Sequence, residues 1–274
     1  MIPGPAPRLA ILLGLPLAVF AFAFLLLPIV RLVAASAEGP SGWALYGEIL
    51  TNARYMRALG DTVVLSLAVA LAALAVSTTA ALFLVRHRFT GRTALIAMLS
   101  FPMAFPGVVV GFLIILLGGR QGLVNDIARD LTGSRLVFAY SMTGLFFGYL
   151  YFSIPRVLLT VMAAAEKLDP RLEEAARSLG AGPVRVLRDV TLPGLAPALA
   201  ASGAIAFATA MGAFGTAFTL ATDIDVLPMV IYTEFTLSAN IAGASALSVV
   251  LGLVTWVLLL LARRISGSGV AAAG

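Results

Sequence analysis

The charged residues of the chain, those best suited to chemistry, are concentrated between Glu166 and Pro193. This stretch holds ten of them, whereas the whole chain has 18 basic and 13 acidic residues. The ten are Glu166, Lys167, Asp169, Arg171, Glu173, Glu174, Arg177, Arg185, Arg188 and Asp189. The chain has no Cys and one His, His87, which excludes thiolate metal sites and disulfides and disfavours a His-based metal site. No constellation of an enzyme is evident either, so we predict no catalytic and no metal-binding residues.

The stretch predicts a helix, a turn and a second helix. Asp169 can cap the first helix and Pro170 suits its first position. Two acids then lie near the positive end of the helix dipole, and Gly180 stands where a left-handed residue would end the helix. One face is apolar, at the spacing i, i+3, i+4 and i+7, and consists of Leu172, Ala175, Ala176 and Leu179.

The second helix is expected to start at Gly182-Pro183 and to close at Pro193. Its apolar side holds Val184, Leu187 and Thr191. A helix pair of this size cannot form its own core, so it needs a partner surface. Because the apolar face is narrow, rich in alanine and without an aromatic anchor, a protein partner is favoured over the lipid surface.

The elements that must position this stretch are membrane helices. Hydrophobic residues make up 61% of the chain, charged residues 11%, and the mean hydropathy is +1.04, whereas soluble domains have about 45–50% apolar and about 25% charged residues. Six blocks are long enough to span a bilayer. They are Leu9–Val33, Thr62–Val85, Thr93–Leu117, Leu136–Ala164, Leu195–Ala221 and Ile241–Ala262. The fold class is therefore an all-α polytopic membrane protein, a single transmembrane domain over residues 1–274 with the helix pair 166–193 within it.

The basic residues predict the orientation. With the N-terminus cytoplasmic, twelve of the 18 Lys and Arg residues lie on the inner side and six on the outer side. This bias favours cytoplasmic N- and C-termini. The outer loop from Glu38 to Asp61 is expected to include a short helix, and Gly118 to Arg135 to form a polar connection. Because the basic residues are scattered between apolar blocks, nucleic-acid binding is disfavoured.

Proline and glycine residues interrupt the third apolar block, and glycine interrupts the fifth. In the third block, Pro102, Phe105, Pro106 and Gly107 predict a bent or open helix. Such a helix either lines a transport path or holds a packing kink, and the residues leave both readings open. We count these four residues, with Phe214 and Gly215 of the fifth block, as candidates to line a pathway.

A fixed pattern within the charged stretch resembles a known signature. Glu174-Ala175-Ala176 is followed after three residues by Gly180 and, after nine more, by Val190-Thr191-Leu192-Pro193. This spacing is similar to the EAA signature of permease subunits of bacterial binding-protein-dependent ABC importers, except that Val190 stands where Ile is usual. The resemblance implies a type I importer fold in which this loop docks on a cytoplasmic ATPase. The docking residues it implies are Glu173, Glu174, Ala175, Ala176, Arg177, Leu179, Gly180, Leu192 and Pro193.

The resemblance also implies the partners. The chain has no G-x-x-x-x-G-K-[ST] run, so ATP and Mg would be bound by a partner ATPase dimer. A second permease subunit, a heterodimer being favoured over a homodimer, and a solute-binding protein or lipoprotein would complete an importer in the cytoplasmic (inner) membrane. The rival class, a secondary transporter, would show ionisable residues at mid-membrane and inverted repeats, and neither is evident.

For the substrate, three stretches look like the polyamine, iron(III), thiamine and phosphonate branch of the family, with sulfate and molybdate permeases as the alternative. They are Pro102–Gly107, Tyr151–Arg156 and Gly212–Thr216. A polycation would require carboxylates along its path, and the available ones are Asp61, Asp223, Asp225 and Glu234, which are expected to be ordinary loop acids. Arg156 is expected to pair with a loop carboxylate or to extend to the headgroups rather than to contact substrate.

Overall fold

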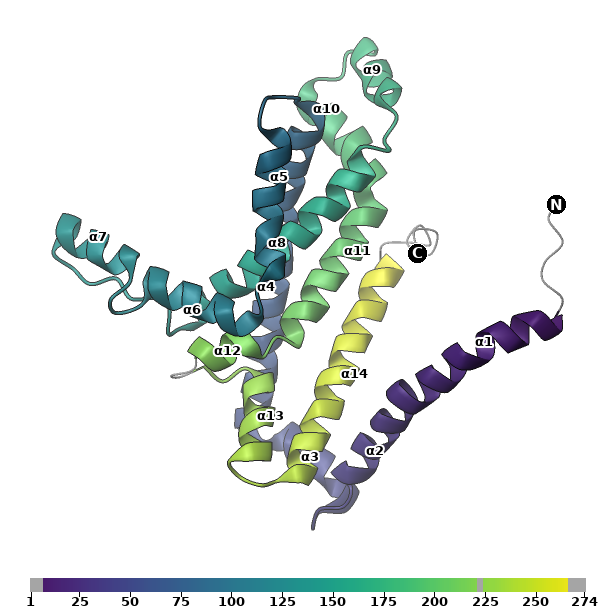
Figure 1. The fold of residues 1–274 in the computed structure, drawn as a ribbon, viewed down its shortest axis with the longest axis vertical. Coiled ribbons are helices and arrows are strands. Elements are labelled where there is room, and N and C mark those ends of the chain that lie inside the picture. The colour runs from purple at the N-terminus through teal and green to yellow at the C-terminus, as the bar shows by residue number, and fades with distance from the viewer. Residues whose placement is uncertain (1–6, 221–223, 266–274) are drawn as a thin grey trace. The chain divides into compact units, whose positions relative to one another are not determined.

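A computed structural model of the chain describes residues 7–220 and 224–265 (Figure 1). Throughout this part of the chain the regular elements are helices. They group into two compact units, Met1–Met56 with Val230–Gly252, and Arg57–Met229 with Leu253–Gly274. Asp223 and the C-terminal tail lie outside the described residues.

The first unit begins with one long apolar helix. It consists of α1 (Pro7–Ala21), the π-helical turn η1 (Phe22–Leu26) and α2 (Leu27–Ser36). The π turn ends at the bond from the Leu27 N–H to the Phe22 carbonyl, directly before Pro28. Because proline has no N–H and its ring clashes with the carbonyl four residues earlier, the wider turn lets the helix continue through it.

The rest of the first unit is held by polar contacts. The turn η2 (Gly42–Ala44) leads into α3 (Leu45–Thr51), the short helix expected between Glu38 and Asp61. The hydroxyls of Ser36 and Tyr46 are hydrogen bonded at 2.7 Å. The Glu234 carboxylate in α13 (Leu227–Thr236) accepts from the Tyr55 hydroxyl at 3.0 Å and from the Asn240 amide at 3.1 Å. Glu234 is 8% exposed, so it is a structural acceptor in this unit rather than a solvated loop acid.

The second unit contains the charged stretch and the broken helices. Its elements are α4 (Ala53–Arg86), α5 (Arg92–Ser100), η3 (Phe101–Ala104), α6 (Gly107–Gly118), α7 (Leu123–Thr132), α8 (Met142–Ala165), α9 (Pro170–Ser178), α10 (Pro183–Val186), η4 (Leu187–Thr191), α11 (Leu192–Met211) and α12 (Gly215–Leu220). In Figure 1, α8 and α11 lie side by side, and α6 packs on both α12 and α8. The core of this unit is apolar and includes Val69, Leu145, Tyr149, Ala217 and Leu220.

Six candidate membrane spans are present among the described residues, as the sequence predicts. They are Gly14–Ser36, Ala53–Arg86, Gly107–Thr132, Met142–Ala165, Pro183–Met211 and Ile241–Ala262. The last, within α14 (Ile241–Ile265), has the predicted bounds. No residue of the best window in the first span is buried, so that helix exposes its apolar surface for lipid or another protein.

Four of the expected boundaries were wrong. The second helix begins at Ala53 rather than Thr62, because the helix extends through the polar residues before the apolar block. The fourth begins at Met142 rather than Leu136, where Ser141 caps it by accepting from the Gly144 N–H. The connection Gly118–Arg135 is not only a polar link, since it contains the amphipathic helix α7.

The other two corrections concern prolines. The third block is divided into α5–η3 and α6, as the prolines predict, and only Gly107–Thr132 is long enough to span. The fifth helix begins at Pro183 instead of Leu195, because Pro193 does not close the preceding helix. A π turn again precedes the proline, ending at the bond from the Leu192 N–H to the Leu187 carbonyl.

Candidate functional site

The first helix of the charged stretch is capped as the sequence predicts. The Asp169 carboxylate accepts from the Arg171 N–H at 3.0 Å, and Pro170 occupies the first turn. At the other end Gly180 has a φ of +85°, the left-handed conformation that favours glycine. The Ala181 N–H then donates to the Ala176 carbonyl at 3.0 Å, which closes the helix. Both ends of α9 are therefore fixed by local geometry.

The second half of the stretch is rigidly continuous with a membrane span. From Pro183 the helix passes through α10 and η4 into α11 and ends at Met211. A force applied at the turn between α9 and α10 would therefore reach the end of α11 through one uninterrupted helix.

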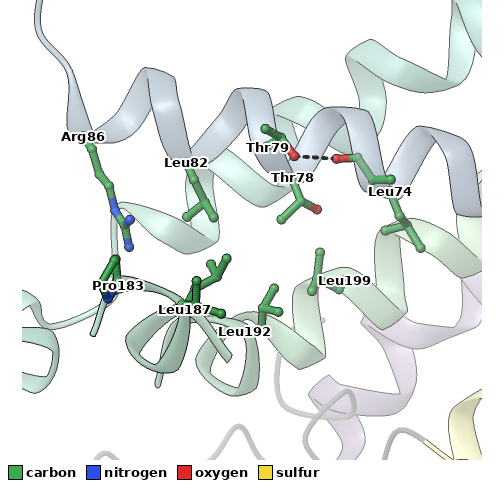
Figure 2. A pocket seen from close by; sticks show the side chains of 11 residues that line it. Leu74, Thr78, Thr79, Leu82, Arg86, Pro183, Leu187, Leu192 and Leu199 are labelled. Carbon is green, nitrogen blue, oxygen red and sulfur yellow. Dashed lines mark hydrogen bonds between the residues drawn. The ribbon is translucent and has the colours of Figure 1, made fainter. Parts of the chain in front are cut away.

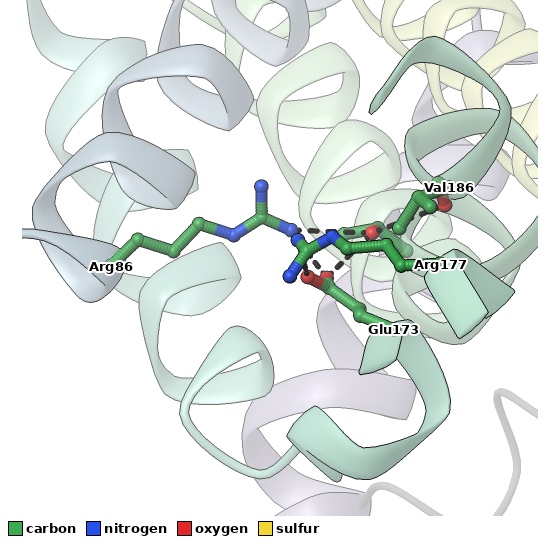
Figure 3. Close-up of polar contacts among 5 residues, drawn as sticks. Arg86, Glu173, Arg177 and Val186 are labelled. Atoms are coloured by element: carbon green, nitrogen blue, oxygen red, sulfur yellow. Dashed lines mark hydrogen bonds and ion pairs between the residues drawn. The ribbon is translucent and has the colours of Figure 1, made fainter. Parts of the chain in front are cut away.

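Glu173 fastens α9 to the rest of the unit (Figure 3). Its carboxylate pairs with the Arg86 guanidinium at the end of α4, and it accepts from the Thr191 hydroxyl in η4 at 2.8 Å. Arg177, one turn further along α9, donates to the other carboxylate oxygen at 3.2 Å. Since the Glu173 side chain is only 18% exposed, these contacts are shielded more than those of an ordinary surface pair.

Glu174 has the opposite environment. Its residue is exposed, and within the described part of the chain its carboxylate makes no hydrogen bond or ion pair. Ala175, Leu179 and Gly180 are exposed beside it, and Leu179 reaches 89%. The two neighbouring carboxylates therefore differ. Glu173 points inward and holds α9, whereas Glu174 points outward and is available to a partner.

A polar cavity of about 830 Å³ lies where α9 meets the ends of α4 and α5. Its charged lining consists of Arg86, Arg88, Arg92, Glu166, Asp169 and Glu173. Arg92 lies 3.6 Å from the Glu166 carboxylate and donates to the Leu84 carbonyl at 2.6 Å. Arg92 thus links the α4–α5 turn to Glu166, the residue that follows α8.

An apolar groove of about 670 Å³ separates α4 from the α10–α11 helix (Figure 2). Leu74 and Leu82 of α4 line one side, and Leu187, Leu192 and Leu199 line the other. Leu192 is 37% exposed, so it faces this groove rather than the outer surface of the charged stretch. Pro193 follows the π turn, in the first turn of α11.

The broken helices meet one another. The Thr216 hydroxyl donates to the Gly107 carbonyl at 2.9 Å, and a Cβ placed on Gly215 would lie 3.0 Å from the Val108 nitrogen. A Cβ at either Gly107 or Gly215 would make an unusually tight contact, so glycine suits both sides of this approach. Gly107 and Gly215, which are distant in sequence, are therefore brought together. Phe214 packs on Phe218, with ring centroids 5.3 Å apart.

The remaining pathway candidates lie on the other side of the break. Phe105 packs edge-on against Phe101 at 4.9 Å, and Pro102 begins η3, which contacts α8. Pro106 is the extended residue directly before α6. All six candidates belong to one unit, and Gly107 and Gly215 lie in direct contact across the break.

Sequence reasoning missed Arg86 and Thr209 at these sites and gave Thr191 no polar role. An arginine ending an apolar helix and a hydroxyl beside the signature proline were available signals. Arg156 does not pair with a loop carboxylate: its Nη1 donates to the Thr209 hydroxyl at 3.0 Å, and no described carboxylate lies within ion-pair distance.

Comparison with known proteins decides the family. Residues 73–267 match the family described as "Binding-protein-dependent transport system inner membrane component". The chain belongs to this family. It is a permease subunit of an ABC importer and a multi-pass protein of the inner membrane, as the signature spacing predicts.

Three relatives illustrate the range of the family. The permease is 34% identical over 206 residues to the molybdenum transport system permease protein ModB of Escherichia coli (strain K12), which covers 74% of this chain and 89% of that protein. It is 32% identical over 218 residues to the sulfate transport system permease protein CysT of Salmonella typhimurium, covering 80% and 76%. It is 29% identical over 254 residues to a putative 2-aminoethylphosphonate transport system permease protein, PhnU, of Salmonella typhi, covering 90% and 88%.

The fold is also that of a solved transporter. A bacterial alginate ABC transporter, crystallised with an alginate pentasaccharide-bound periplasmic protein, matches with a TM-score of 0.83 over 96% of each chain. The sequence identity is 22%, so this likeness concerns the fold alone. It confirms the predicted fold class, a helical ABC transporter permease.

Proposed function

We propose that this permease forms the membrane pathway of an importer for small oxyanions or phosphonates and is driven through α9 by a partner ATPase. The observation that carries the coupling role is the arrangement of two neighbouring carboxylates. Glu173 is turned inward and bound by Arg86 and Thr191, whereas Glu174 is exposed and unbound among the described residues. Because α9 is bound to the permease through Glu173 and exposed at Glu174, a partner that binds the exposed side can move the helices to which α9 is attached.

The docking surface is the exposed side of α9. It consists of Glu174, Ala175, Ala176, Leu179 and Gly180, where small residues allow a partner helix or groove to approach closely. Glu173 and Arg177 support this surface from within, and Leu192 and Pro193 shape the helix that carries its motion into α11. ATP and Mg belong to the partner ATPase, and no cofactor is assigned to this chain.

The wider assembly follows from size and family. Six spans form about half of an importer pathway, so a second permease subunit, most simply a related but different chain, completes it. An ATPase dimer and a solute-binding protein are the other partners. The charge bias of the loops favours a cytoplasmic location for both termini and α9.

The substrate class rests on the relatives and on charge. Those named above carry molybdenum, sulfate and 2-aminoethylphosphonate in their names. Polyamine-like solutes, predicted from the sequence, remain the alternative. However, the Glu234 carboxylate already accepts hydrogen bonds from Tyr55 and Asn240, which leaves it little capacity to bind a polycation.

A thermal-shift screen of the cognate binding protein tests the substrate class. The probes are molybdate, sulfate, 2-aminoethylphosphonate and spermidine at equal concentration. Stabilisation by one of the three anions, and not by spermidine, supports the proposal. Stabilisation by spermidine alone would overturn it and restore the polyamine alternative.

A further inference from the structure

We propose that Arg156, oriented by Thr209, binds the anionic group of the solute as it passes through the permease. The inference rests on the proposed oxyanion or phosphonate substrate and assigns it a contact within the membrane helices. It differs from the sequence-based expectation, which placed Arg156 against a loop carboxylate or the headgroups.

The first argument is depth. Arg156 lies nine residues before Ala165, where α8 ends. At 1.5 Å per residue, this is about 14 Å from the end of the helix. A charged side chain in a spanning helix is costly and usually marks a functional position or a specific partner.

The second argument is direction. Side chains on an α-helix tilt toward its N-terminus, which for Arg156 is away from Glu166 and the charged stretch. The guanidinium instead reaches Thr209, which lies two residues before the end of α11. The side chain is therefore directed across to a neighbouring helix rather than back toward the headgroups.

The third argument is unused hydrogen-bonding capacity. A guanidinium has five N–H donors, and among the described residues Arg156 uses one, the bond to Thr209. The Thr209 hydroxyl hydrogen is directed at the Ile205 carbonyl, 2.7 Å away, so its oxygen is the acceptor for the arginine. Thr209 thus fixes one arm of the guanidinium without neutralising it, and the other donors have no hydrogen-bond partner among the described residues.

The fourth argument is location beside the broken segments. Thr209 lies in the last turn of α11 before the Gly212–Phe214 break, where the Tyr149 hydroxyl donates to the Ala213 carbonyl. Tyr149 lies two turns before Arg156 on α8. On the same side of α11, Ile205 is 50% exposed, so this chain leaves the surface open. The charge thus lies next to the segment that packs on Gly107, in an accessible position.

The chemistry favours a tetrahedral oxyanion. Charge-assisted hydrogen bonds from a planar guanidinium match two oxygens of a sulfate-like or phosphonate group. The same uncompensated positive charge would repel a polycation. Arg156 therefore serves as a specificity-determining contact as well as a binding one.

Uptake by the complete transporter, reconstituted in proteoliposomes with its ATPase, partner permease and binding protein, tests this site. The probes are radiolabelled molybdate, sulfate and spermidine. We expect Arg156→Gln to lower anion uptake about tenfold or more, as for the loss of a hydrogen bond to a charged group. Arg156→Lys, which retains the charge, should keep a larger share, and Thr209→Val should lie between wild type and Arg156→Gln. The matched control is Arg31→Gln, which removes an exposed arginine from α2.

The outcomes separate the two proposals. If wild type imports an anion and Arg156→Gln imports it equally well, the anion site is wrong while the proposed function stands. If wild type imports spermidine and neither anion, the proposed substrate class fails and the anion site with it. If Arg156→Lys assembles normally but is as inactive as Arg156→Gln, the role does not depend on charge and the inference is overturned.

Discussion

The carboxylate of Glu173 and the guanidinium of Arg86 form an ion pair that joins the helix α9 to the C-terminal end of α4. Thr191 adds a second link from the same carboxylate to η4. α9 is therefore attached at once to two membrane helices, α4 and the helix that continues into α11. This arrangement explains how a nine-residue helix can act as a lever although it has no buried residue of its own.

Removal of the Glu173 charge should uncouple transport. We expect Glu173→Gln to lower substrate uptake per ATP hydrolysed several-fold, because α9 loses its ion pair to α4 and its acceptor for Thr191. The measurement is the ratio of uptake to ATP hydrolysis in proteoliposomes. Glu166→Gln is the matched control, since Glu166 is 58% exposed and its pair with Arg92 is longer, at 3.6 Å. Equal ratios in the two variants would contradict the role of Glu173.

Charge reversal on the outward carboxylate should weaken docking instead. Glu174→Lys is expected to reduce co-purification of the ATPase with the permease, because the exposed carboxylate is placed to meet the partner. Membrane insertion should be unaffected, as Glu174 makes no side-chain contact within the described residues. Undiminished association would count against the docking surface.

The turn after α9 depends on one glycine. Gly180→Val places a β-branched residue at a φ of +85°, at a cost of about 1–2 kcal/mol for a left-handed L-residue. We expect the end of α9 to rearrange and uptake to fall although the protein still inserts. Gly182→Val is the control, because Gly182 has an ordinary φ of −70° and a Cβ there meets nothing within 4 Å. Normal uptake by the Gly180 variant would exclude a need for this turn.

The contact between the two broken helices should be intolerant of side chains. Gly215→Val would place a Cβ 3.0 Å from the Val108 backbone nitrogen, and backbone cannot give way as a flexible side chain can. We predict a lower melting temperature of the purified permease and reduced uptake. In Gly60→Val, by contrast, the Cβ meets nothing within 4 Å. Similar melting temperatures for the two variants would show that the close approach is not required.

Much of this arrangement could be predicted from the sequence because its signals are local. The capping of α9 by Asp169 and its ending at Gly180 depend on residues within one turn. The break at Pro102–Gly107 follows from the missing proline N–H and its ring. The span count follows from apolar length alone, and the fixed spacing from Glu174 to Pro193 identified the family.

The features that could not be predicted depend on contacts between residues distant in sequence, or on how a helix accommodates a proline. Nothing near Glu173 in sequence indicates that Arg86 would reach it, and the same is true of Arg156 and Thr209. Pro193 was expected to end a helix, but a π turn accommodates it, as another does before Pro28. Similarly, an amphipathic helix as short as α7 resembles a polar loop in composition.

The most direct test of the coupling claim uses the absence of Cys from the chain. A single Leu179→Cys variant carries the one thiol of the permease, at the 89% exposed C-cap residue of α9. A bifunctional maleimide should cross-link it to the ATPase, with a yield that changes between nucleotide-free and ATP-bound states. Leu131→Cys, 80% exposed on α7, should give no such product. Absence of the Leu179 cross-link, or equal cross-linking from both positions, would contradict docking through α9.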